Sequence, residues 1–81
     1  MEGEEYREER KTVEGLYEEI DALIAKKSVE AAKKKLEKTE KKLDELSLKI
    51  SGEIQERSLS NLRIKAGHLA DSIEKLEMKK G

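Results

Sequence analysis

Apolar residues recur at intervals of three and four positions along nearly the whole chain, and no proline interrupts them. This spacing places the apolar side chains on one face of an α-helix, at the a and d positions of a heptad repeat. The first set is Tyr6, Val13, Leu16, Tyr17, Ile20, Leu23 and Ile24. The second set is Val29, Ala32, Leu36, Thr39, Leu43, Leu46 and Ile50, and the third is Leu59, Leu62, Ala66, Leu69, Ile73 and Leu76. The chain is therefore predicted to be all-α, with three amphipathic helices.

Charged residues make up 46% of the 81 positions, and aromatic residues make up only 2%. A charge content this high is typical of disordered segments, but the regular apolar spacing favours folded helices. The length suits one domain, so residues 1–81 are interpreted as a single helical bundle with an aliphatic core. Abundant Lys and Glu without cysteine are typical of thermostable proteins, and equally of idealised designed bundles.

Two breaks in the phase of the apolar spacing predict where the chain turns. The step from Ile24 to Val29 is five positions, which places a turn near residues 25–27. Ser28 would then cap the start of the second helix. The second break falls at Gly52, a residue type that readily adopts the left-handed conformation found at helix ends.

These turns define an antiparallel up-down-up three-helix bundle with coiled-coil-like heptad packing. The helices are predicted to span about residues 4–26, 28–51 and 54–79. Two alternatives remain open at this point. The second turn could lie later, at residues 57–61, or the second helix could continue as one arm of an extended dimeric coiled coil.

The register of the apolar side chains supports the antiparallel arrangement. Around the first turn, Ile20 and Ala32 lie at equal sequence distances from residue 26. Around the second turn, Leu43 and Leu62 are similarly matched. In an antiparallel pair of helices, such residues share one layer of the core.

Charge is unevenly distributed along the chain. Residues 1–24 hold nine acidic and three basic residues, whereas residues 25–50 hold nine basic and five acidic residues. An acidic helix and a basic helix attract each other when they lie side by side. In the predicted register the facing charges are opposite, in the pairs Glu19 with Lys35, Glu5 with Lys49, and Arg10 with Glu40.

Lys35, Lys42 and Lys49 repeat every seven residues and form a basic stripe beside the core of the second helix. A basic stripe can contact nucleic-acid phosphates, so a nucleic-acid-binding accessory is an alternative function. Several acidic residues interrupt the stripe, no aromatic residue is available for base stacking, and the net charge is −1. The stripe is therefore expected to face the acidic first helix and water, and a nucleic-acid partner is disfavoured.

The third helix carries apolar residues outside its core stripe. Ile64 and Met78 lie there, with Gly67 next to Ile64 on the same outer face. Glycine inside a helix costs about 1 kcal/mol relative to alanine, and a flat spot beside exposed apolar groups suits the approach of another helix. We interpret Ile64, Gly67, His68, Asp71 and Met78 as a candidate surface for a protein partner or for a homo-oligomer.

No catalytic or cofactor motif is evident in the sequence. The single histidine, His68, has only Asp71 nearby on its helix face, which is too few ligands for a zinc site. Tyr6 and Tyr17 are expected at the edge of the core, with their hydroxyl groups reaching water. No apolar run approaches the ~20 residues that span a bilayer.

The predicted function is therefore a non-enzymatic, cytoplasmic protein-interaction or oligomerisation module with no cofactor, no metal and no membrane partner. A designed or orphan bundle without a specific function is the remaining alternative.

Overall fold

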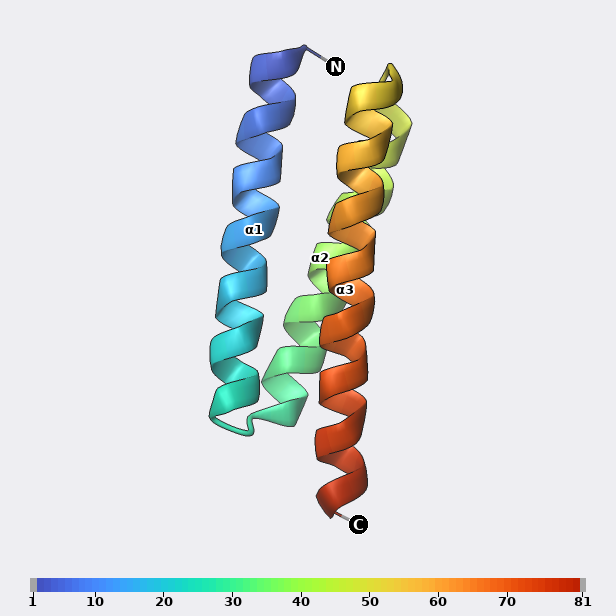
Figure 1. Cartoon of the computed structure of the whole chain (residues 1–81). Helices are drawn as coiled ribbons and strands as arrows, with labels where there is room; N and C mark the ends of the chain where they lie inside the picture. Colours follow the sequence, from blue (N-terminus) through green and yellow to red (C-terminus); the bar gives the residue numbers. More distant parts are fainter. Residues whose placement is uncertain (1, 81) are drawn as a thin grey trace.

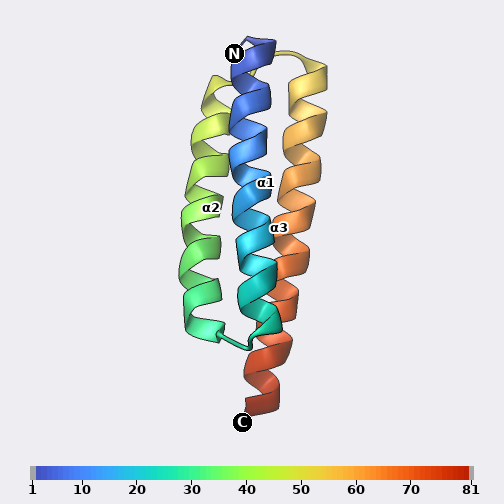
Figure 2. The same ribbon diagram turned by 90° about the vertical axis from the view of Figure 1, so that its left-hand side faces the viewer.

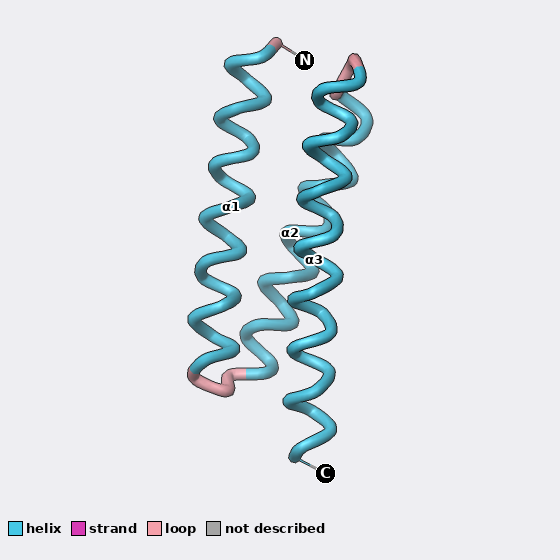
Figure 3. The backbone as a smooth tube through the Cα atoms, viewed as in Figure 1, coloured by secondary structure: helices cyan, strands magenta, loops and turns pink. Residues whose placement is uncertain are grey.

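The computed structural model describes residues 2–80 and contains three helices joined by short turns (Figure 1). The helices are α1 (Gly3–Ala25), α2 (Val29–Lys49) and α3 (Glu53–Lys80). Successive helices run in opposite directions and all three pairs pack together, which confirms the predicted all-α bundle. The tube in Figure 3 places one turn at each end of the bundle. Every helix boundary lies within two residues of its predicted position.

The bundle is elongated, with principal dimensions of 45 × 17 × 15 Å. The longest helix is α3, with 28 residues against 23 in α1 and 21 in α2. Its C-terminal turns therefore project beyond the α1–α2 turn (Figure 2). Across residues 2–80, no helix combines the length and apolar character needed to cross a membrane.

The first turn lies where the phase of the spacing breaks, but its chemistry differs from the prediction. Lys27 adopts the left-handed conformation, with φ 62°. The N–H groups of Lys27 and Ser28 donate to the carbonyls of Ile24 and Leu23, each at 2.9 Å, in the pattern of a Schellman motif. The expected side-chain cap from Ser28 is absent. Its backbone, at φ −86° and ψ 74°, departs from the extended conformation that directs a serine hydroxyl to the helix amides.

The second turn, at residues 50–52, confirms the earlier of the two predicted positions. Gly52 has φ 87°, a conformation that strains any residue with a Cβ, and α3 begins at Glu53. Ser51 N–H donates to Gln55 Oε1 at 3.0 Å, which ties the turn to the first turn of α3. The alternative turn at residues 57–61 is wrong, because these residues are helical and Leu59 is buried.

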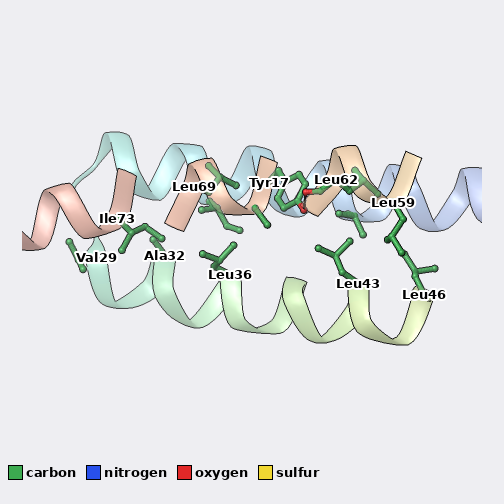
Figure 4. Close-up of a cluster of buried hydrophobic side chains, with 13 residues drawn as sticks. Tyr17, Val29, Ala32, Leu36, Leu43, Leu46, Leu59, Leu62, Leu69 and Ile73 are labelled. Carbon is green, nitrogen blue, oxygen red and sulfur yellow. Dashed lines mark hydrogen bonds between the residues drawn. The ribbon is translucent and has the colours of Figure 1, made fainter. Parts of the chain in front are cut away.

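The core consists mainly of aliphatic side chains from all three helices (Figure 4). Leu36, Leu43, Leu62 and Leu69 occupy its central layers and are 1–7% exposed, as the heptad pattern predicts. Thr39 is the one buried polar residue among those described, and its hydroxyl donates to Lys35 O at 2.8 Å. This bond within α2 satisfies the hydroxyl group and allows it to occupy the core.

The face that α1 buries is rotated relative to a simple a and d stripe. Tyr17 is only 3% exposed, whereas Leu16, the predicted core residue beside it, is partly exposed. Helix α1 packs against both α2 and α3, so its inward face must point between them. The flank of α1 that carries Arg10 and Tyr17, at the e positions of its heptads, therefore faces α3.

Ion pairs between helices follow this geometry. Lys35 Nζ lies 2.7 Å from Glu19 Oε2, which confirms that predicted pair. Glu5 and Lys49 line the same shallow hollow between α1 and α2, as the register requires. The predicted pair of Arg10 with Glu40 is wrong: Arg10 Nε lies 3.7 Å from Glu14 on its own helix, because the e side of α1 faces α3 rather than α2.

Candidate interaction surface

The basic stripe of α2 lies against the acidic helix α1. Lys35 pairs with Glu19, and Lys42 Nζ lies 2.8 Å from Glu9 Oε2. Lys49 lies at the end of the stripe in the shallow hollow between α1 and α2, which is also lined by four glutamates. These contacts place the positive charge of the stripe next to compensating carboxylates, where it stabilises the α1–α2 pairing more than it creates a basic surface.

The outward face of α3 carries the predicted partner surface. Ile64, Gly67, His68, Asp71 and Met78 are all exposed, on the side of α3 away from its buried core residues. Ile64 is 57% exposed and Met78 is 76% exposed. The structure therefore places these residues together on one face, and their role in binding a partner remains a prediction.

One exposed apolar residue of this face was missed by the sequence analysis. Ile54, in the first turn of α3, is 85% exposed. It continues the same face, because alternating steps of three and four residues connect it to the predicted residues. The complete row is Ile54, Arg57, Asn61, Ile64, His68, Asp71, Lys75 and Met78, which we call the outer stripe of α3. The spacing was visible in the sequence, but Ile54 lies so close to the turn that its side chain could equally have closed the core.

The outer stripe carries three apolar residues along α3, separated by two and then by three polar residues. Three of the four large aliphatic side chains that are exposed in the described structure lie on it, and the fourth, Leu48, lies on α2. Gly67 flanks the stripe near its middle, and a Cβ added there would meet no heavy atom within 4 Å. The fold of the single chain therefore gives no steric reason for glycine at this position.

A second feature lies between the parallel helices α1 and α3. Tyr17 donates its hydroxyl hydrogen to Leu62 O at an oxygen–oxygen distance of 2.5 Å. Burial raises the pKa of the Tyr17 phenol to about 12, and the Glu40 carboxylate adds to this rise while the Arg63 guanidinium opposes it. The prediction that this hydroxyl reaches water is wrong, because rotation of α1 directs it into α3.

Tyr6 lines a hollow nearer the N-terminal ends of α1 and α3, together with Arg10 and Ile54. The Tyr6 hydroxyl and Arg10 Nε are both buried and have no hydrogen-bond partner within residues 2–80. The Tyr6 hydroxyl therefore does not reach water either. A buried hydroxyl group without a hydrogen-bond partner, such as that of Tyr6, lowers the stability of the fold.

The chemistry available on these surfaces is limited. A buried tyrosine with a raised pKa is a poor proton donor and a poor nucleophile near neutral pH. His68 and Asp71 are exposed on the outer stripe, and no cluster of three metal-binding side chains occurs within the described chain.

Comparison of the chain with protein-family models, with curated proteins and with solved structures found no match.

Proposed function

We propose that this protein is a small helical interaction module that binds protein chains through the outer stripe of α3. One observation carries the proposal: exposed Ile54, Ile64 and Met78 lie along a single face of one helix. Isolated apolar residues are ordinary on protein surfaces, but a row along one helix face is the usual contact surface for a partner helix. The proposed role is non-enzymatic and requires no cofactor.

The expected affinity follows from the size and composition of the stripe. Burying the remaining exposed surface of one Ile or Met side chain contributes roughly 1–2 kcal/mol. The polar residues between the apolar ones contribute little, and association itself costs at least about 4 kcal/mol. We therefore expect weak association, with a Kd in roughly the micromolar range or above.

Sedimentation equilibrium of Ile64→Glu beside a matched control tests the proposal. Leu48→Glu is the control, because Leu48 is 86% exposed and lies on α2 rather than α3. Between about 10 µM and 1 mM the wild-type mass should rise above the monomer value if the partner is a second copy. Ile64→Glu should prevent the rise, and Leu48→Glu should leave it unchanged.

Two results would count against the outer stripe. Equal loss of association in both variants would show non-specific apolar aggregation. If the wild-type protein stays monomeric throughout this concentration range, the outer stripe does not mediate self-association. Cytoplasmic location and high thermal stability remain predictions from the sequence.

A further inference from the structure

We propose that the hollow between the N-terminal ends of α1 and α3 binds a small organic anion with a carboxylate group and an apolar body, such as an aromatic carboxylate. Tyr6, Arg7 and Arg10 line one side of this end hollow, and the turn at residues 51–52 and the first turns of α3 line the other. The start of α1 and the turn before α3 lie at the same end of the bundle (Figure 1). The site does not depend on the proposed protein contact.

The size and walls of the end hollow suit a small ligand. Its volume is about 690 Å³, within the range of roughly 300–1,000 Å³ that is typical of small-molecule sites. Tyr6 and Ile54 are its large apolar lining residues. Ile54 is 85% exposed, so a ligand that covers its side chain removes apolar surface from water.

The charge of the end hollow differs from that of the neighbouring hollows. Arg7 and Arg10 line it together with a single carboxylate, that of Glu53. Four glutamates and two lysines line the shallow hollow between α1 and α2, and three carboxylates and two basic residues line the next hollow along α1 and α3. The end hollow therefore has an excess of positive charge in a protein of net charge −1, and this excess attracts an anion.

The N-terminus of α3 adds to the positive potential. Gly52 and Glu53, at the start of this helix, line the end hollow. The helix dipole and the amide groups of a first helical turn favour an anion at that end. The guanidinium group of an arginine matches a carboxylate with two parallel hydrogen bonds, and the apolar walls favour a carboxylate that is attached to a ring.

Two unpaired polar atoms point independently to a ligand. Tyr6 is only 6% exposed, and its hydroxyl has no hydrogen-bond partner within residues 2–80. Arg10 Nε is also buried and unpaired, because Glu14 Oε1 at 3.7 Å is too far away for a hydrogen bond. Both atoms belong to residues that line the end hollow. A carboxylate bound there supplies the acceptors that these two donors lack.

Access to the two donors requires an adjustment of side chains. Both atoms are buried, whereas the Arg7 and Ile54 side chains that line the same hollow are exposed. Exposed side chains change rotamer within nanoseconds. The lining therefore adjusts as the ligand enters, while the backbones of α1 and α3 stay in place.

Titration of ¹⁵N-labelled protein with benzoate, followed by amide chemical shifts, tests the proposal. Benzamide and acetate serve as comparison ligands at the same ionic strength. Benzoate should shift the amide signals of Arg7, Arg10 and Ile54 and saturate with a Kd in roughly the millimolar range, as expected for so small a ligand. Benzamide lacks the charge and acetate lacks the ring, so each should bind at least about fivefold more weakly.

Two variants and a matched control locate the site. Arg10→Gln removes the charge and should weaken benzoate binding about tenfold, and Tyr6→Phe removes only the hydroxyl and should weaken it about threefold. Arg57→Gln is the control, because Arg57 is an exposed arginine of α3 outside the end hollow, and it should leave the Kd unchanged. The same spectra show whether each variant is folded.

Several results would overturn the site. Equal binding of benzoate and benzamide would exclude recognition of an anion, and an unchanged Kd in either Arg10→Gln or Tyr6→Phe would exclude the contacts that define the site. Shifts that rise linearly with benzoate up to about 20 mM would show non-specific ionic contact only. These results leave the proposed protein contact untouched, because sedimentation of Ile64→Glu tests that contact separately.

Discussion

The two tyrosines of the bundle allow a matched test of its internal hydrogen bonding. Both hydroxyl groups are buried, but only Tyr17 has a partner, Leu62 O at 2.5 Å, whereas the Tyr6 hydroxyl has none among the described residues. We predict that Tyr17→Phe lowers the free energy of unfolding and that Tyr6→Phe does not. Each replacement removes the same single atom, so the difference reports on hydrogen bonding rather than on packing.

The magnitude follows from the environment of each hydroxyl. A buried intramolecular hydrogen bond contributes about 0.5–1.5 kcal/mol, and Leu62 O keeps its place in the hydrogen-bond ladder of α3 when the phenol is removed. Tyr17→Phe should therefore cost about 1 kcal/mol, which lowers the Tm of a domain of this size by roughly 4–8 °C. Tyr6→Phe removes an unpaired buried hydroxyl, so stability should stay equal or rise by about 1 kcal/mol.

The raised pKa of Tyr17 adds a dependence on pH with a definite sign. An unfolded tyrosine ionises near pH 10, and the folded one ionises at about 12. Below pH ~10 both states hold the proton, so the stabilisation is complete; between about pH 10 and 12 only the unfolded state loses the proton, and stability falls. The loss is roughly 3 kcal/mol at most, and Tyr17→Phe should abolish it.

Urea unfolding followed by far-UV circular dichroism at pH 7 and through pH 9–12 measures both effects. Lysine residues titrate in the same range, but they are present in both proteins and cancel in the difference. The wild type should be the more stable protein at pH 7 by about 1 kcal/mol, and above pH ~10 this advantage should vanish and then reverse, so that Tyr17→Phe is the more stable protein near pH 12. A Tyr17→Phe protein as stable as wild type at pH 7, or a difference independent of pH up to 12, would refute the assignment of a buried phenol bonded to α3.

Three further predictions concern the core, the register and the first turn. Leu43→Ala and Leu69→Ala should each cost about 2–5 kcal/mol in urea unfolding, and a cost below ~1 kcal/mol in both would place these residues outside the core. Glu19→Lys should weaken the bundle and the added Lys35→Glu should restore it, with a coupling of a few tenths of a kcal/mol at low salt; zero coupling would contradict the α1–α2 pairing. Lys27→Gly should raise stability by about 0.5–1 kcal/mol, because Lys27 adopts a left-handed conformation that glycine tolerates at less cost, and an unchanged Tm would argue against that conformation in solution.

The spacing of apolar residues was sufficient to predict the helices and their antiparallel register. Both breaks in phase coincide with turns, since a continuous helix would have rotated its apolar face away from its neighbours. Pairing of Glu19 with Lys35 shows that the register between α1 and α2 is also correct. The helix boundaries and the register depend on residues close to a turn in sequence. A short turn leaves few alternative ways to pair the two helices that it joins.

The errors that concern α1 share one physical origin in the position of α3, whereas the missing Ser28 cap follows from the backbone conformation of the first turn. Heptad spacing predicts the position of each residue along the axis of α1. It does not predict whether α3 packs on the flank of α1 that carries Leu16 or on the flank that carries Tyr17. That choice decides whether Leu16 or Tyr17 is buried, and it directs Arg10 toward α3 instead of Glu40. The outer stripe was predicted in part, because exposure of Ile64 and Met78 follows from the phase of α3 alone.

The short turns also shape how the chain can fold. Contacts between α1 and α2, and between α2 and α3, close small loops, so either helical hairpin can form early at little cost in chain entropy. The bond from Tyr17 to Leu62 is different, because it joins residues 45 positions apart across two turns. It forms when α1 and α3 meet across both turns, so the tyrosine signal of a Tyr6→Phe variant, which retains Tyr17 alone, would time the docking of α1 on α3 rather than the initial collapse.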